Sequence, residues 1–212
     1  MMKEESKIKQ WKKSFLDHKY LILLSVLLLI ISLVLEYFAS NYVGRVGGVA
    51  APDIILDNIP TFDLDIIFIY GGALVTLSLL FYPVFFRVKD IHKVVSQFSL
   101  LVLMRDAFIT FTHLADPASA LHFVAPEWFY IFTFQNGLFF SGHTAIPFLG
   151  FLLFKESKIR YFFLAASIIM GSVVLMMHVH YTIDVFSAYF ITYGTFKMGE
   201  WIFSKINHYN SK

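Results

Sequence analysis

The sequence predicts an all-α integral membrane protein, a bundle of six transmembrane helices with both termini in the cytoplasm. Of the 212 residues, 58% are hydrophobic and only 15% are charged, and the mean hydropathy is +0.67. A soluble domain is about 45–50% apolar and about 25% charged. Several apolar runs also approach the roughly 20 residues that an α-helix needs to cross a bilayer.

Six apolar runs are separated by polar turns or by a loop that contains glycine and proline. We expect membrane-spanning helices at about residues 20–39, 64–86, 94–114, 137–154, 161–178 and 182–203. The first run is longer than the apolar core of a usual signal peptide, so it is interpreted as a retained helix. Residues 1–19 and 205–212 are expected to form cytoplasmic tails, and residues 20–204 a single transmembrane domain.

The distribution of basic residues sets the expected orientation of the bundle. All 17 lysines and arginines except Arg45 and Arg105 fall in the N-terminal tail, the turns after the second and fourth runs, or the C-terminal region. Cytoplasmic segments carry the excess of basic residues, so the 115–135 loop is expected on the outer face. This loop is rich in aromatic residues, which fits either an ordinary interfacial belt or a lid or lipid entry surface over a functional site.

Two features of the composition exclude whole classes of function. There is no cysteine, so disulfides, thiolate catalysis and thiol metal sites are absent. The net charge of +2 is too small to indicate a nucleic-acid partner. The expected partners are the bilayer and its lipids.

Ionisable residues at the ends of apolar runs are the candidate functional residues, because such positions are costly unless they serve a function. His143 lies near the start of the fourth run, His180 at the end of the fifth and Asp184 in the first turn of the sixth, and all three of these run ends are expected on the outer side. Arg105 is about twelve residues into a run that starts inside. At about 1.5 Å per residue it reaches the outer half of the bilayer, so four separate positions are expected to meet in one leaflet.

The spacing of these residues favours phosphate chemistry. His180 and Asp184 are four apart, so on a helix they share a face, and a carboxylate on one imidazole nitrogen makes the other a better base or nucleophile. Ser141 and Gly142 stand at an expected helix start, where backbone N–H groups favour an anion. Arg105 can hold a phosphate through two parallel hydrogen bonds.

Two other interpretations of the same residues stay open. Arg105 could pair with a structural acid such as Asp106 or Asp184. A zinc site could also use histidine and aspartate ligands, here His143, His178, His180 and Asp184. Because His178 and His180 are two apart and face differently on a helix, the expectation is that the site holds no metal and needs no cofactor.

The arrangement resembles the type 2 phosphatidic acid phosphatase (PAP2) superfamily and, more closely, its sphingomyelin synthase branch. The matching segments are Phe140-Ser141-Gly142-His143-Thr144, Leu153-Phe154-Lys155-Glu156, His180-Tyr181-Thr182-Ile183-Asp184-Val185, Ala188-Tyr189-Phe190-Ile191-Thr192 and Pro52-Asp53-Ile54-Ile55-Leu56-Asp57. The chain departs from the broad phosphatase pattern at Phe98, where that pattern has lysine, at Asp106 and Phe140, where it has proline, and at Val173 and Val174, where it has Ser-Arg. It keeps one phosphate-binding arginine, as the synthase branch does.

The resemblance implies that residues 20–204 form a catalytic domain for lipid phosphotransfer on the outer face of the membrane. A phospho-headgroup such as phosphocholine would move from a glycerophospholipid to a lipid hydroxyl through a phosphohistidine. His180, oriented by Asp184, would be the nucleophile and His143 the acid and base. Ser141, Gly142 and Arg105 would bind phosphate.

Two alternative functions follow from the same residues. A lipid phosphate phosphatase would use water as the acceptor. A transporter or channel would use Arg105, Asp184 and the histidines as an ion path, although no span is interrupted by paired Gly and Pro and no inverted repeat is visible.

Overall fold

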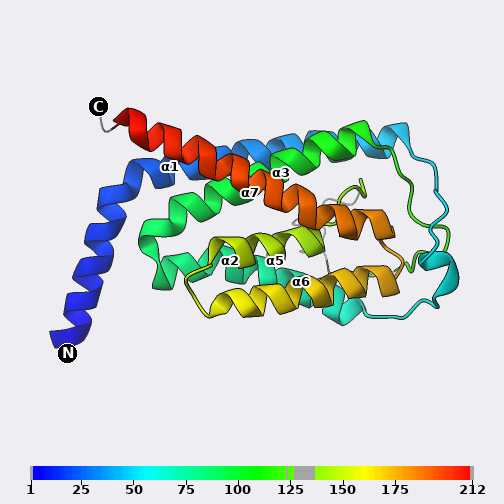
Figure 1. The fold of residues 1–212 in the computed structure, drawn as a ribbon, viewed down its shortest axis with the longest axis horizontal. Coiled ribbons are helices and arrows are strands. Elements are labelled where there is room, and N and C mark those ends of the chain that lie inside the picture. Colours follow the sequence, from blue (N-terminus) through cyan, green and yellow to red (C-terminus); the bar gives the residue numbers. More distant parts are fainter. Residues whose placement is uncertain (1, 123, 127–136, 211–212) are drawn as a thin grey trace.

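The computed structural model describes residues 2–122, 124–126 and 137–210, and these residues fold into a helical bundle (Figure 1). The principal helices are α1 (Met2–Val46), α2 (Gly72–Phe86), α3 (Ile91–Phe111), α5 (Gly142–Leu153), α6 (Ile159–Met176) and α7 (Thr182–Asn210). Short helical turns are η1 (Leu56–Asn58), η2 (Ile67–Gly71) and η3 (Val88–Asp90). In the described part of the chain, extended pairing is limited to an isolated bridge between Val49 and Leu114.

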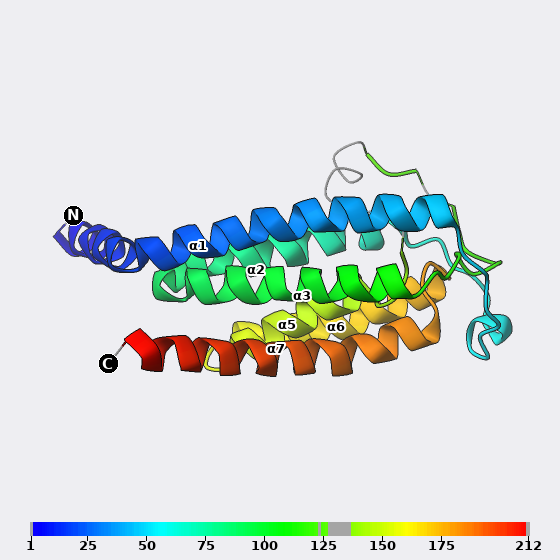
Figure 2. The ribbon, with the colours of Figure 1, turned by 90° about the horizontal axis from the view of Figure 1, so that it is seen from above.

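The axes of the helices are roughly aligned with one another, and the chain runs back and forth along this common axis (Figures 1 and 2). Both ends of the chain lie at one end of the bundle, and the loops around residues 47–63 and 112–122 lie at the other (Figures 1 and 2). We call the latter the loop end. Both ends at one end of the bundle is the arrangement expected for a chain that crosses a membrane an even number of times.

The core joins α2, α3, α5, α6 and α7. Each helix contributes a buried apolar side chain to one cluster, and examples are Leu79, Phe98, Leu149, Phe163 and Ala188. Helix α1 packs along α3 (Figure 2). Ser25, Ser32 and Ser40 are buried on α1, and small residues at such an interface allow close approach of two membrane helices.

Much of the remaining surface is apolar. Along α1, large side chains such as Leu23, Leu24 and Ile30 are more than half exposed, which suits contact with lipid tails rather than water. Among the residues that the structure describes, four helical stretches are long and apolar enough to cross a membrane: Ile8–Val46, Ile67–Phe86, Val88–Phe111 and Ile159–Met176. These findings fit a multi-pass membrane bundle.

The fourth predicted span is longer than the helix observed there. The sequence predicts a helix over 137–154, whereas α5 covers only Gly142–Leu153. Its 12 residues extend about 18 Å, which is shorter than the hydrocarbon core of a bilayer. The residues before it are not helical because Gly137 has a φ of 97° and Ser141 is extended, with a ψ of 112°.

The first predicted span is shorter than the observed helix. Helix α1 includes residues 2–19, predicted as a polar tail, and the N-terminal part of the helix leaves the bundle at an angle (Figure 1). Within that part, the Trp11 indole donates a hydrogen bond to the Val84 carbonyl at 2.8 Å. His18 stacks on His92, so this segment contacts the end of α2 and the start of α3.

The predicted orientation can be tested by labelling single cysteines in intact cells, because the natural chain has none. Val124 lies in the 115–135 loop and is 92% exposed. We expect V124C to react with a membrane-impermeant thiol reagent before lysis, and K9C, at the opposite end, only after lysis. The reverse pattern would overturn the orientation and the outer-face location of the site.

Candidate active site

The side chains predicted to act together meet at the loop end, where α5 and α7 begin. The centre is the His180–Asp184 pair. The Asp184 carboxylate lies 3.2 Å from Nδ1 of His180, and both residues are buried. One of the two imidazole nitrogens is thereby paired with a carboxylate, which leaves Nε2 as the position for chemistry.

Asp184 is held by the start of its own helix and by α5. Its carboxylate also accepts a hydrogen bond from the Tyr181 backbone N–H at 2.9 Å. As the third residue of α7, it occupies the place where an acidic side chain reaches back to the first N–H groups and favours the helix dipole. Its backbone carbonyl accepts a hydrogen bond from the Ser141 N–H at 3.1 Å, which joins the starts of α5 and α7.

His143 faces this pair from the first turn of α5. Its ring stacks on Phe68, with 4.2 Å between ring centroids, and hydrogen-bonds to the Phe68 backbone. His180 and Arg105 lie close enough to interact with it electrostatically. Phe68 belongs to η2, a π-helical turn, and such turns are often found at functional sites.

The start of α5 presents backbone donors to the same region. Ser141 is the N-cap residue and is fully buried, and its hydroxyl oxygen accepts a hydrogen bond from Thr144 at 3.2 Å. The first N–H groups of a helix have no intrahelical acceptors. Gly142 and His143 supply such groups, so an anion beside Ser141 would meet both the donors and the positive end of the helix dipole.

Arg105 lies next to that helix start and is held in a network of its own. Its guanidinium donates to Glu36 at 2.7 Å, to the Gly137 carbonyl at 2.7 Å and to the Phe140 carbonyl at 3.3 Å. Its Nε is 3.9 Å from the point that a Cβ on Gly142 would occupy. The three bonds fix the guanidinium at the edge of the site.

Arg105 pairs with Glu36 of α1, not with Asp106 or Asp184, the two acids that the sequence suggests as structural partners. Glu36 is a partner that the sequence alone did not indicate. Asp106 is buried and interacts electrostatically with both Glu36 and Arg105. The available signal was an acidic residue within the first apolar run, which is as unusual there as an arginine in the third.

His178 does not join His143 and His180. It lies in the α6–α7 connection with a φ of 55°, and its Nδ1 hydrogen-bonds to the hydroxyl of Ser119 in the 112–122 loop. Among the residues that the structure describes, no three His, Asp or Glu side chains are grouped so that they could hold a metal ion. The zinc interpretation therefore gains no support from this part of the chain.

Comparison with known proteins gives one match. Residues 136–201 match the family model "PAP2 superfamily C-terminal". This segment includes Ser141, Gly142, His143, His180 and Asp184, but not Arg105. No curated protein and no solved structure matches the chain. The match supports the PAP2 superfamily and its phosphatase or phosphotransferase activity on lipids, and it does not separate the sphingomyelin synthase branch from the rest.

Proposed function

We propose that this protein is a membrane lipid phosphotransferase of the sphingomyelin synthase type. It moves a phospho-headgroup, such as phosphocholine, from a glycerophospholipid to a lipid hydroxyl. The observation that carries the proposal is the buried His180–Asp184 pair, within electrostatic range of His143 and beside the start of α5. The PAP2 match over the same segment supports a lipid phosphate as the substrate.

In the first step, His180 is the nucleophile. Asp184 holds Nδ1, so Nε2 carries the lone pair and attacks phosphorus. A P–N bond forms as the P–O bond to diacylglycerol breaks. His143 donates a proton to the departing oxygen, and Asp184 stabilises the positive charge on the His180 ring.

In the second step, the acceptor replaces the histidine. His143, now without its proton, removes the proton of the lipid hydroxyl, and the acceptor oxygen attacks phosphorus. The P–N bond breaks and its electron pair returns to Nε2 of His180, which restores the starting enzyme. Water in place of the lipid hydroxyl would release a free phosphate monoester by the same route.

In this proposal, the start of α5 and Arg105 bind the phosphate. Backbone N–H groups of Gly142 and His143, together with Ser141, face the charge that develops on the phosphoryl oxygens. Arg105 has five N–H donors, and its bonds to described residues use three of them. The guanidinium can therefore keep Glu36 and still donate to a phosphate oxygen.

Product analysis tests this proposal. Purified protein should be incubated with phosphatidylcholine labelled in its phosphate, with and without ceramide, and separately with labelled phosphatidic acid. Label appearing in a ceramide product supports transfer. Free phosphate or phosphocholine alone would support the phosphatase alternative, and no change in any lipid would reject both.

Gly72 lies so close to the ring of His143 that a substitution at Gly72 can test the position of that ring. A Cβ on Gly72 would lie 2.8 Å from both Cδ2 and Nε2 of the ring, so Gly72→Ala must displace it. Because alanine favours a helix, we expect an intact fold and kcat lowered by about tenfold to hundredfold. The measurement is kcat with thermal unfolding in detergent.

Gly71→Ala is the matched control. Its Cβ would lie 3.2 Å from the sulfur of Met170, a side chain flexible enough to move aside. Equal activity in the two variants would argue that His143 need not occupy its observed place.

A further inference from the structure

The turn between α6 and α7, residues 177–181, is held at the loop end by two loops that are distant in sequence. From the 47–63 loop, the Phe62 N–H donates at 2.8 Å to the carbonyl of Met176, the last residue of α6 and the residue directly before the turn. From the 112–122 loop, the Leu121 N–H donates to the Met177 carbonyl at 3.1 Å. Because this turn contains His180, the two loops help to hold the proposed nucleophile in place.

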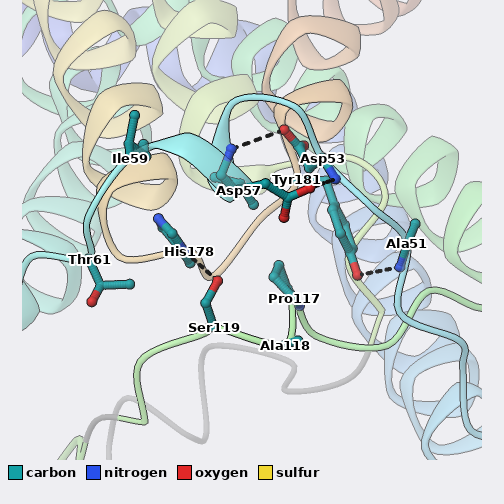
Figure 3. Close-up of a pocket in the computed structure, with 11 residues that line it drawn as sticks. Ala51, Asp53, Asp57, Ile59, Thr61, Pro117, Ala118, Ser119, His178 and Tyr181 are labelled. Atoms are coloured by element: carbon teal, nitrogen blue, oxygen red, sulfur yellow. Dashed lines mark hydrogen bonds between the residues drawn. The ribbon is translucent and has the colours of Figure 1, made fainter.

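Tyr181 joins the two loops to the turn. Its hydroxyl donates to the Ala115 carbonyl at 3.0 Å and accepts from the Ala51 N–H at 3.0 Å. Tyr181 as a whole residue is 2% exposed. Tyr181 and Asp53 both line a cavity of about 470 Å³ between these loops, together with His178 and Ser119, and Figure 3 shows these lining side chains.

Asp53 binds the first residue of α7 through two short hydrogen bonds. Its carboxylate accepts from the Thr182 backbone N–H at 2.6 Å and from the Thr182 hydroxyl at 2.7 Å. Thr182 is the first residue of α7, whose N–H has no acceptor within the helix. A residue 129 positions away therefore provides the cap of this helix.

The charge state of Asp53 is consistent with its role as the cap of α7. Burial raises the pKa of Asp53, but the hydrogen bonds from Thr182 and from the backbone of Ile55 and Leu56 outweigh burial and leave the pKa below its usual value of 3.8. The carboxylate is thus ionised at neutral pH, and its stabilising effect is present above pH 3.8 and is lost as the pH falls through the lower, folded-state pKa. A charged acceptor at a helix N-terminus is the favourable arrangement.

The place of Thr182 links this cap to catalysis. His180 lies two residues before it and Asp184 two residues after it, and the two side chains contact each other across the helix start. A shift of Thr182 changes the geometry of that contact. We propose that Asp53 is a positioning residue, which fixes the start of α7 and so sets the orientation of His180 and Asp184 for the reaction. The catalytic part of this inference rests on the proposed function.

Kinetics of four variants test the inference. Asp53→Ala removes both bonds to Thr182, and we expect kcat to fall about tenfold to hundredfold with KM nearly unchanged, because Asp53 is not placed at the phosphate. Thr182→Val keeps the backbone bond and should lose less, whereas Thr182→Ser keeps both bonds and should retain activity. Asn58→Ala is the control, since the Asn58 amide donates to the Ile54 carbonyl within the same loop.

Hydrogen–deuterium exchange provides a readout that needs no activity. We expect Asp53→Ala, and not Asn58→Ala, to speed exchange of the backbone amides at the start of α7. Unchanged exchange overturns the anchoring role. Faster exchange with unchanged kcat overturns the positioning role. If the wild type acts on no lipid, the proposed function fails, and exchange alone decides whether Asp53 anchors the helix.

Discussion

His180→Ala is expected to abolish turnover, with a loss of about 10⁴-fold or more, because the variant has no atom that can carry the phosphoryl group. It should also abolish the acid-labile phosphohistidine. The measurement is a rapid quench with labelled phospholipid, followed by peptide mapping. His113→Ala is a suitable control, since the His113 ring bonds to the Thr110 carbonyl and has no part in the proposed reaction.

His143→Ala should separate the two histidines. Without the general acid, departure of a poor leaving group slows by about 10²–10⁴-fold. A substrate with a good leaving group needs no proton, so the adduct on His180 should still form from it and can be trapped. An adduct mapped to His143 would reverse the assignment, and no adduct under any quench would favour direct, single-step transfer.

Asp184→Asn tests the support of the nucleophile. The amide can keep the bond to the Tyr181 N–H while losing the charge that stabilises the His180 imidazolium. We expect a severe loss of kcat in a protein that still folds. Wild-type turnover in this variant would show that the contact serves only the start of α7.

The contact between His180 and Asp184 could be predicted from the sequence, but its geometry could not. The spacing of four residues predicts a pair on one helical face. In the structure, His180 precedes α7, and the pair forms because Asp184 turns back toward the start of its helix. The spacing in the sequence therefore predicts which two residues pair. The geometry of the pair depends on where α7 begins, which the spacing does not predict.

Partners that are far apart in sequence were not predictable in the same way. Glu36 reaches Arg105 across 69 positions, and Asp53 reaches Thr182 across 129. No periodicity relates such residues, because the packing of α1 on α3 and the folding of the 47–63 loop bring them together. The resemblance noted for the Pro52–Asp57 segment marked the region without assigning Asp53 a role.

Arg105→Lys is expected to lose about a hundredfold in kcat/KM, because an ammonium cannot reproduce the planar donors that hold two carbonyls, Glu36 and a phosphate at once. The fold should survive, since a lysine still supplies a positive charge beside Glu36. Arg105→Ala should behave differently. It leaves the buried Glu36 carboxylate unpaired, which typically costs about 3–5 kcal/mol, so it should unfold at a lower temperature.

The two variants separate phosphate binding from a structural ion pair. Both kcat/KM and thermal unfolding in detergent should be measured, with Arg87→Lys as the control, because Arg87 pairs with Asp90 at the surface. If Arg105 binds phosphate, Arg105→Lys loses activity at nearly unchanged stability. Full activity with lysine, together with instability with alanine, would instead assign Arg105 to the Glu36 pair and leave the start of α5 as the phosphate-binding element.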